Sequence, residues 1–125
     1  MAHQEASITE PSLLIRINRT FRQGMSALAL YEATRGVWCL GTRRELARLA
    51  LAVFQGRVVE VYEIHEWHPA GTARYETRTF TDLRGRWEFT GTVASAELRE
   101  KYVGRSVGHL LTRGSQAPVL YINVP

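Results

Sequence analysis

The alternation of apolar and polar positions along the chain predicts mainly short β-strands. Leu13, Ile15 and Ile17 alternate with polar residues, which is typical of a strand with one buried face. Residues 86–90 alternate in the same way, residues 119–124 form an apolar run, and residues 37–39 suggest a brief strand. Residues 58–67 are apolar at both odd and even positions, as expected for a strand buried on both faces. Residues 48–54 also fit a helix, but a tight turn at 54–57 favours a strand.

Two short helices and one helical turn complete the predicted elements. Ser26 is expected to cap a helix that runs to about Thr34, and Ser95 to cap a helix over residues 96–102. Residues 42–45 have the spacing of a capping box, which predicts a helical turn. Six or seven strands with two short helices indicate an α+β fold, and we expect a small β-barrel of about six strands.

The length of 125 residues is that of one domain with a single core. Residues 1–12 are polar and lack periodicity, so we expect a disordered tail followed by one domain over residues 13–125. No apolar run has the length of a membrane span or of a signal-peptide centre, which predicts a cytoplasmic protein without a membrane partner. The single cysteine excludes an internal disulfide and a four-cysteine zinc site.

The net charge of +4 is unevenly distributed along the chain. Residues 1–12 carry −2, residues 13–57 carry +6, residues 58–100 carry −3, and the remainder carries +3. Such segregation is expected when one face of a protein binds an anion. The fifteen arginines beside one lysine suit bidentate contacts to phosphate or base edges, although codon bias in a GC-rich genome would give the same ratio.

Two motifs suggest catalysis or metal binding, and neither has the required context. Residues 104–108 spell a nucleophile elbow around Ser106, with His109 next to it, but a helix rather than a strand precedes them. His65 and His68 are three residues apart at the end of a strand, whereas the zincin motif places two histidines four apart on a helix. We therefore expect no catalytic residues, no metal and no cofactor.

Aromatic residues beside arginines are the strongest functional signal. Tyr31, Arg35 and Trp38 lie within eight residues of one another, and Arg43, Arg44 and Arg48 follow. Aromatic rings offer faces on which bases stack, and arginines contact phosphates or base edges. The alternative interpretation is that Trp38 belongs to the core.

The order of elements and two longer phrases resemble the EVE and YTH branches of the PUA-like superfamily. The phrases are residues 30–38, which end in Gly36-Val37-Trp38, and residues 98–104. The resemblance covers roughly residues 13–124, and residues 36–38 are similar to a YTH-type motif. It implies a compact barrel whose pocket holds a flipped or single-stranded modified base between aromatic walls, often in a restriction or RNA-modification context. Trp38 matches a pocket position, and Tyr62, Trp67 and Trp87 are candidates for the other walls by residue type.

The sequence therefore predicts a non-catalytic domain that binds DNA or RNA and recognises a modified or flipped base. The expected binding residues are Tyr31, Thr34, Arg35, Trp38, Arg43, Arg44, Arg48, Trp67 and Arg105. One alternative is a small-ligand or enzymatic module that uses the same cavity, with Ser106 and His109, or Glu32, supplying the chemistry. Another is an accessory protein that binds a second protein.

Overall fold

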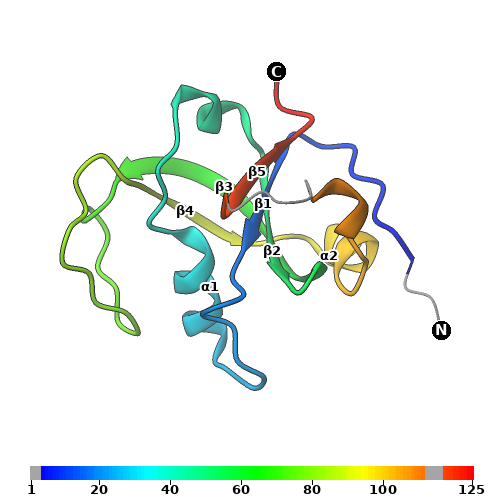
Figure 1. Cartoon of the computed structure of the whole chain (residues 1–125), viewed down its shortest axis with the longest axis horizontal. Coiled ribbons are helices and arrows are strands. Elements are labelled where there is room, and N and C mark those ends of the chain that lie inside the picture. The colour runs from blue at the N-terminus through cyan, green and yellow to red at the C-terminus, as the bar shows by residue number, and fades with distance from the viewer. Residues whose placement is uncertain (1–3, 112–116) are drawn as a thin grey trace.

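A computed structural model describes residues 4–111 and 117–125 of the chain as a five-stranded mixed sheet with two α-helices (Figure 1). The strand order across the sheet is β4-β3-β2-β1-β5. The strands are β1 (Ser12–Arg16), β2 (Leu49–Phe54), β3 (Arg57–Pro69), β4 (Trp87–Val93) and β5 (Val119–Ile122).

The two central strands, β1 and β2, are parallel, and the other neighbours in the sheet are antiparallel. A parallel pair needs a long crossover. Here the crossover contains helix α1 (Ala27–Arg35) and the 3₁₀ helix η1 (Thr42–Leu46). A tight turn joins β2 to β3, and both of its central residues, Gln55 and Gly56, have positive φ angles, as a type I′ turn requires.

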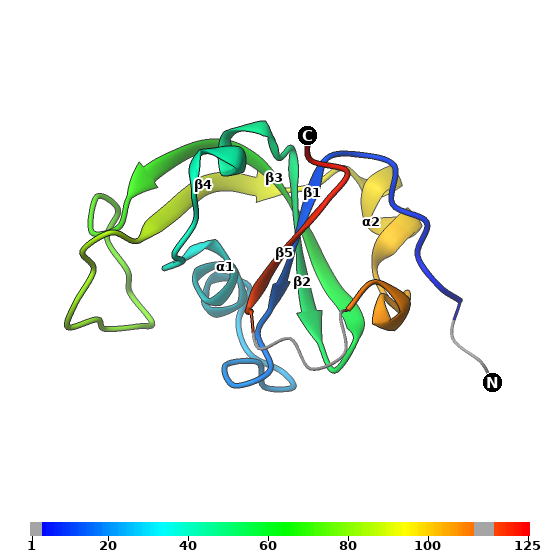
Figure 2. The ribbon, with the colours of Figure 1, turned by 45° about the horizontal axis from the view of Figure 1, so that its top comes forward.

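Both faces of the sheet are buried. Leu13 and Ile15 of β1 lie in the apolar cluster that contains residues of α1, whereas Leu14 between them lies in a second cluster. The second cluster is covered by helix α2 (Ala96–Tyr102) and contains the fully buried Tyr102. Figure 2 shows α1 and α2 on opposite sides of β1, β2 and β5. This two-sided burial explains why the central strands are apolar on both faces.

The structure confirms the α+β class and both predicted helix caps. The Ser26 hydroxyl accepts a hydrogen bond from the amide of Ala29, and the Ser95 hydroxyl accepts one from Leu98. The helical turn at η1 and the strand β2 also follow the expectation.

The sheet has five strands and is not closed into a barrel. No strand pairing joins β4 to β5 within the described part of the chain. The segment over residues 37–39, expected as a strand, contributes a single bridge between Trp38 and Trp87 at one end of β4. One bridge leaves the remaining edge of β4 without a neighbouring strand, so the sheet stays open there.

The described part of the N-terminal segment, residues 4–12, contacts the domain. The Ala6 amide donates to the Ser106 carbonyl, and the Ala6 side chain is buried. The Ser106 amide donates to the carbonyl of Gln4. Residues 1–3 of the expected tail lie outside the described residues. Among the described helices, none has the length and apolar content needed to cross a membrane.

Candidate functional site

Trp38 is held in place at the junction of α1 and β4. Its indole N–H donates to the Thr34 carbonyl at 2.9 Å, and its main chain pairs with that of Trp87. The side chain packs against the α1-side core but is only partly buried. A tryptophan fixed by its N–H and its backbone, with part of its ring accessible, is a preorganised wall for a planar ligand.

Trp38 lines a small hollow of about 250 Å³ between the ends of β4 and β5. We call it the Trp38 hollow. Its walls are formed by Trp38, Cys39 and Leu40 after α1, by Arg86 just before β4, and by residues 117–119 at the start of β5. Most of its lining is apolar, and Arg86 is its single charged side chain among the described residues. The hollow therefore lies at the opening that the unclosed sheet leaves.

Two further hollows continue from the Trp38 hollow. The first, of about 430 Å³, shares Pro118 with it and is lined by residues 16–20. The second, of about 370 Å³, shares Arg19 and Thr20 with the first and extends to Arg22 and Arg78. We call the three adjoining hollows the basic groove.

The lining of the basic groove is positively charged. Its lining contains the five arginines Arg16, Arg19, Arg22, Arg78 and Arg86, and in the described part of the chain no Asp or Glu lines it. Arg19, Arg22 and Arg86 are exposed. Exposed arginines along a continuous groove, with a partly exposed tryptophan at one end, can bind a chain of anionic groups that carries planar rings.

The long loop over residues 70–86 connects β3 to β4 (Figure 1). It brings Arg78 and Arg86 to the groove, and two buried carboxylates hold it. Glu88 of β4 accepts hydrogen bonds from the amides of Gly71 and Ala73. Glu32 of α1 accepts hydrogen bonds from the amides of Glu76 and Thr77 and from the Thr77 hydroxyl. A loop fixed by such charge-assisted bonds places its arginines without a ligand.

Burial raises the pKa of the Glu32 carboxyl, but the Thr77 hydroxyl, the two loop amides and the charge of Arg35 outweigh it. The net result is a pKa below the ordinary value of 4.5. Glu32 is therefore ionised at neutral pH and holds the loop as a carboxylate.

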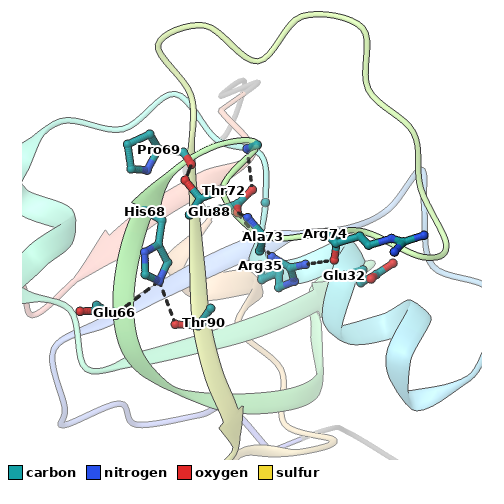
Figure 3. Close-up of polar contacts among 12 residues, drawn as sticks. Glu32, Arg35, Glu66, His68, Pro69, Thr72, Ala73, Arg74, Glu88 and Thr90 are labelled. Atoms are coloured by element: carbon teal, nitrogen blue, oxygen red, sulfur yellow. Dashed lines mark hydrogen bonds and ion pairs between the residues drawn. The ribbon is translucent and has the colours of Figure 1, made fainter.

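Arg35 and Arg78 attach the same loop to the end of α1. Arg35 donates to the Arg74 carbonyl, and its Nη1 lies 3.9 Å from the Glu88 carboxylate (Figure 3). The Arg35 guanidinium also lies over the ring of Tyr75, 3.9 Å from its centroid. Arg78 donates to the carbonyls of Glu32 and Gly36. The side of the loop that faces α1 is thus bonded at several points along its length.

Three of the expected binding residues are buried and serve the fold. Thr34 is fully buried and its hydroxyl donates to the Leu30 carbonyl. Arg35 is buried beside Glu88, as described above. Arg44 is buried with its guanidinium over the ring of Trp87, 3.3 Å from the centroid, and it donates to the Gly41 carbonyl. None of the three lines the basic groove.

Two expected binding residues, Tyr31 and Trp67, and the wall candidate Tyr62 pack in the core. Tyr31 packs against Tyr62 and Phe89, and its hydroxyl accepts a hydrogen bond from the Gly91 amide. Trp67 is 8% exposed and packs edge-on against Phe89. Tyr62 is 2% exposed, whereas Trp87 is only partly buried and lines a separate hollow.

The remaining expected arginines lie outside the basic groove. Arg43 donates to the main-chain oxygens of Val124 and Pro125. Arg48 is half-exposed, 3.7 Å from the Glu63 carboxylate. Arg105 follows α2 and pairs through its carbonyl with Val58, at the opposite end of β3 from Trp67. Of the nine residues expected from the sequence, the structure places only Trp38 in the groove.

The nine residues expected from the sequence do not include the five arginines of the groove, although Arg16, Arg19 and Arg22 belong to the basic block that the sequence showed over residues 13–57. Arg78 and Arg86 lie about sixty residues further along the sequence and reach the groove through the loop that Glu32 and Glu88 hold, so no local pattern could place them there.

The motifs considered for catalysis and metal binding form other contacts. Ser106 accepts a hydrogen bond from the Gly108 amide, and the His109 ring lies 3.4 Å from the Glu5 carboxylate. His65 and His68 contact the hydroxyls of Thr92 and Thr90 across β3 and β4. The described residues contain no group of three or more His, Cys, Asp or Glu side chains that would hold a metal ion.

Comparisons with models of protein families, with curated proteins and with solved structures gave no match for this chain.

Proposed function

We propose that this domain binds single-stranded or locally unpaired nucleic acid, with one base in the Trp38 hollow and the flanking backbone along the basic groove. The observation that carries the proposal is that the three hollows adjoin through shared lining residues, with five arginines and, among the described residues, no Asp or Glu in their lining. The domain then acts as a binding module rather than as an enzyme.

The Trp38 hollow has the size and the walls for one base. Its volume of about 250 Å³ is sufficient for one planar heterocycle. Stacking on an aromatic side chain contributes about 1–3 kcal/mol per base. Extruding a base from a duplex costs a few kcal/mol, so stacking alone favours a strand that is already unpaired. The resemblance to EVE and YTH domains implies, more specifically, that the base bound in the Trp38 hollow is a modified one.

The positive charge of the groove supplies the contacts that we expect to the phosphates of the nucleic acid. Phosphate contacts position a strand without selecting its sequence. The exposed guanidinium groups of Arg19 and Arg22 form no ion pair with a described residue, so no ion pair with those residues has to be broken before a phosphate binds. An uncharged ligand of the Trp38 hollow would gain nothing from these arginines, which favours nucleic acid over a neutral small molecule.

Cys39 offers a direct test, because it is exposed, lines the Trp38 hollow and is the only cysteine of the chain. The rate of its alkylation by a maleimide is measured with and without a single-stranded oligonucleotide. We expect the oligonucleotide to slow alkylation, and the free oligonucleotide concentration for half protection to rise with salt. Binding without protection of Cys39 would contradict a base in this hollow. Equal protection by an uncharged heterocycle would favour a small-ligand module.

A further inference from the structure

A second, larger hollow shares Arg86 with the Trp38 hollow. It measures about 640 Å³ and lies between the ends of β3 and β4 and the second half of the loop over residues 70–86. We call it the Phe80 hollow. Two of its walls are aromatic, Phe80 and Trp87, and Arg86 lines both this hollow and the Trp38 hollow.

The main-chain pairing places the aromatic walls of the two hollows next to each other. The amides of Trp38 and Trp87 each donate to the carbonyl of the other residue, which makes them a directly opposed antiparallel pair. Side chains of such a pair project to the same side and stay close together. The Cβ atoms of the two tryptophans therefore lie close together, and each side chain lines one of the two hollows.

Arg86 is the charged group between the hollows. It is exposed, and its guanidinium forms no hydrogen bond or ion pair with a described residue. The acidic residue in the lining of the Phe80 hollow, Asp82, is instead paired with Arg84 at 3.3 Å. An exposed guanidinium between two aromatic-walled hollows, which acts on Asp82 through its charge without forming an ion pair with it, suits a phosphate that links two ring-bearing groups.

We infer that the Phe80 hollow is a second base subsite, so that the ligand is two adjacent nucleotides whose linking phosphate binds Arg86. This inference rests on the proposed function and adds the class of ligand, a single strand that presents two consecutive unpaired bases. A single flipped base within a duplex would leave the second hollow empty. The domain accordingly prefers a single strand to a duplex with one extruded base.

The test compares a deoxymononucleotide with the dinucleotide of the same base, using protection of Cys39 and direct titration of the full chain. We expect the dinucleotide to bind about tenfold more tightly, because one further base stacks and one phosphate is shared. Phe80→Leu keeps an apolar side chain but removes the ring face, so it should abolish most of this gain while the mononucleotide affinity stays within about twofold.

Arg86→Gln and Arg74→Gln form a matched pair, because each removes one exposed arginine from the same loop and Arg74 lines none of these hollows. Arg86→Gln should reduce the dinucleotide gain, whereas Arg74→Gln should leave it intact. If the mononucleotide protects Cys39 but the dinucleotide binds no better, or if both arginine variants lose affinity equally, the second subsite is refuted and the proposed function stands. If no nucleotide or oligonucleotide protects Cys39, the proposed function itself is refuted.

Discussion

Two main-chain hydrogen bonds join Trp38 and Trp87. The Trp38 amide donates to the Trp87 carbonyl at 2.9 Å, and the Trp87 amide donates to the Trp38 carbonyl at 2.8 Å. This pairing attaches the segment after α1 to the end of β4. It also closes part of the gap that the open sheet leaves between β4 and β5. Arg44 lies over the ring of Trp87 and so connects η1 to the same pair. The position of Trp38 at the groove thus depends on contacts from α1, η1 and β4 together.

Replacing Trp38 separates stacking from packing. Trp38→Ala should lower the affinity for a single-stranded oligonucleotide by roughly 1–3 kcal/mol, since one stacking face is lost. Trp38→Phe retains a ring but not the N–H that donates to Thr34, so most of the affinity should remain. The measurement is a binding titration beside a thermal melt. If Trp38→Ala unfolds the domain while Trp38→Phe binds as weakly as the alanine variant, Trp38 is core and not a wall.

Local signals along the chain predicted the elements, and long-range contacts determined how they are arranged. Ser26 and Ser95 cap their helices through bonds to residues three positions away, which a sequence pattern can show. Whether the sheet closes depends on how residues 37–39 meet β4, and that contact joins segments about fifty residues apart. To predict that the sheet is open and not a closed barrel, information on this long-range contact was needed, and no local pattern contains it.

The candidate site was predicted only in part, because long-range contacts also determine which arginines are exposed. Arginines are usually exposed, so Arg35 and Arg44 were expected at a binding surface. The fold buries both, because Glu88 and the Tyr75 ring lie beside Arg35, and the Trp87 ring and the Gly41 carbonyl beside Arg44. These partners come from separate segments. The expectation of a basic block over residues 13–57 nevertheless located Arg16, Arg19 and Arg22, which line the groove.

The charge of the groove can be tested with two matched double variants. Arg19→Gln with Arg22→Gln removes two groove arginines, whereas Arg48→Gln with Arg105→Gln removes two arginines that line none of the three hollows. The first should weaken binding of any single strand and reduce the slope of log K against log salt by about 1.4, as expected for two lost phosphate contacts. The second should leave the slope nearly unchanged. Equal effects of the two double variants would place the binding surface elsewhere.

Glu32→Gln should loosen the loop over residues 70–86. An amide cannot replace the carboxylate as acceptor for two amides and a hydroxyl with equal strength, so the loop loses charge-assisted bonds. We expect faster cleavage by trypsin after Arg74, Arg78, Arg84 and Arg86 at neutral pH, identified by mass spectrometry. Glu76→Gln is the control, because Glu76 contributes its amide and not its side chain to this network. Unchanged cleavage in Glu32→Gln would mean that other contacts suffice to hold the loop.

The same carboxylate makes stability depend on pH in a defined direction. The pKa of Glu32 in the folded protein lies below its ordinary value of 4.5, because the loop hydrogen bonds and Arg35 favour the charged form. Its contribution is therefore complete above that value and is lost as the pH falls through the lower folded pKa. Thermal melts should show a steeper loss of stability below pH 4.5 for the unmodified chain than for Glu32→Gln. Parallel curves for the two proteins would contradict this.

Gly36 is expected to tolerate no side chain, because the loop packs directly on it. A Cβ at Gly36 would overlap the Tyr75 hydroxyl and lie 3.0 Å from the Glu88 Cβ. Gly36→Ala should therefore destabilise the domain by about 1–3 kcal/mol, the usual cost of overpacking. Gly41→Ala is the matched control, because nothing lies within 4 Å of a Cβ there.

The partner of this clash can be identified by a second substitution. The Tyr75 hydroxyl is buried near the Glu88 carboxylate but forms no hydrogen bond of good geometry with a described residue, so Tyr75→Phe alone should cost little. Combined with Gly36→Ala, Tyr75→Phe removes the overlapping oxygen and should restore part of the lost stability. Chemical denaturation of the four proteins gives the coupling free energy. The double variant should be more stable than the sum of the two single effects predicts, by about 1 kcal/mol. Additive effects would show that Glu88, and not the Tyr75 hydroxyl, limits the space at Gly36.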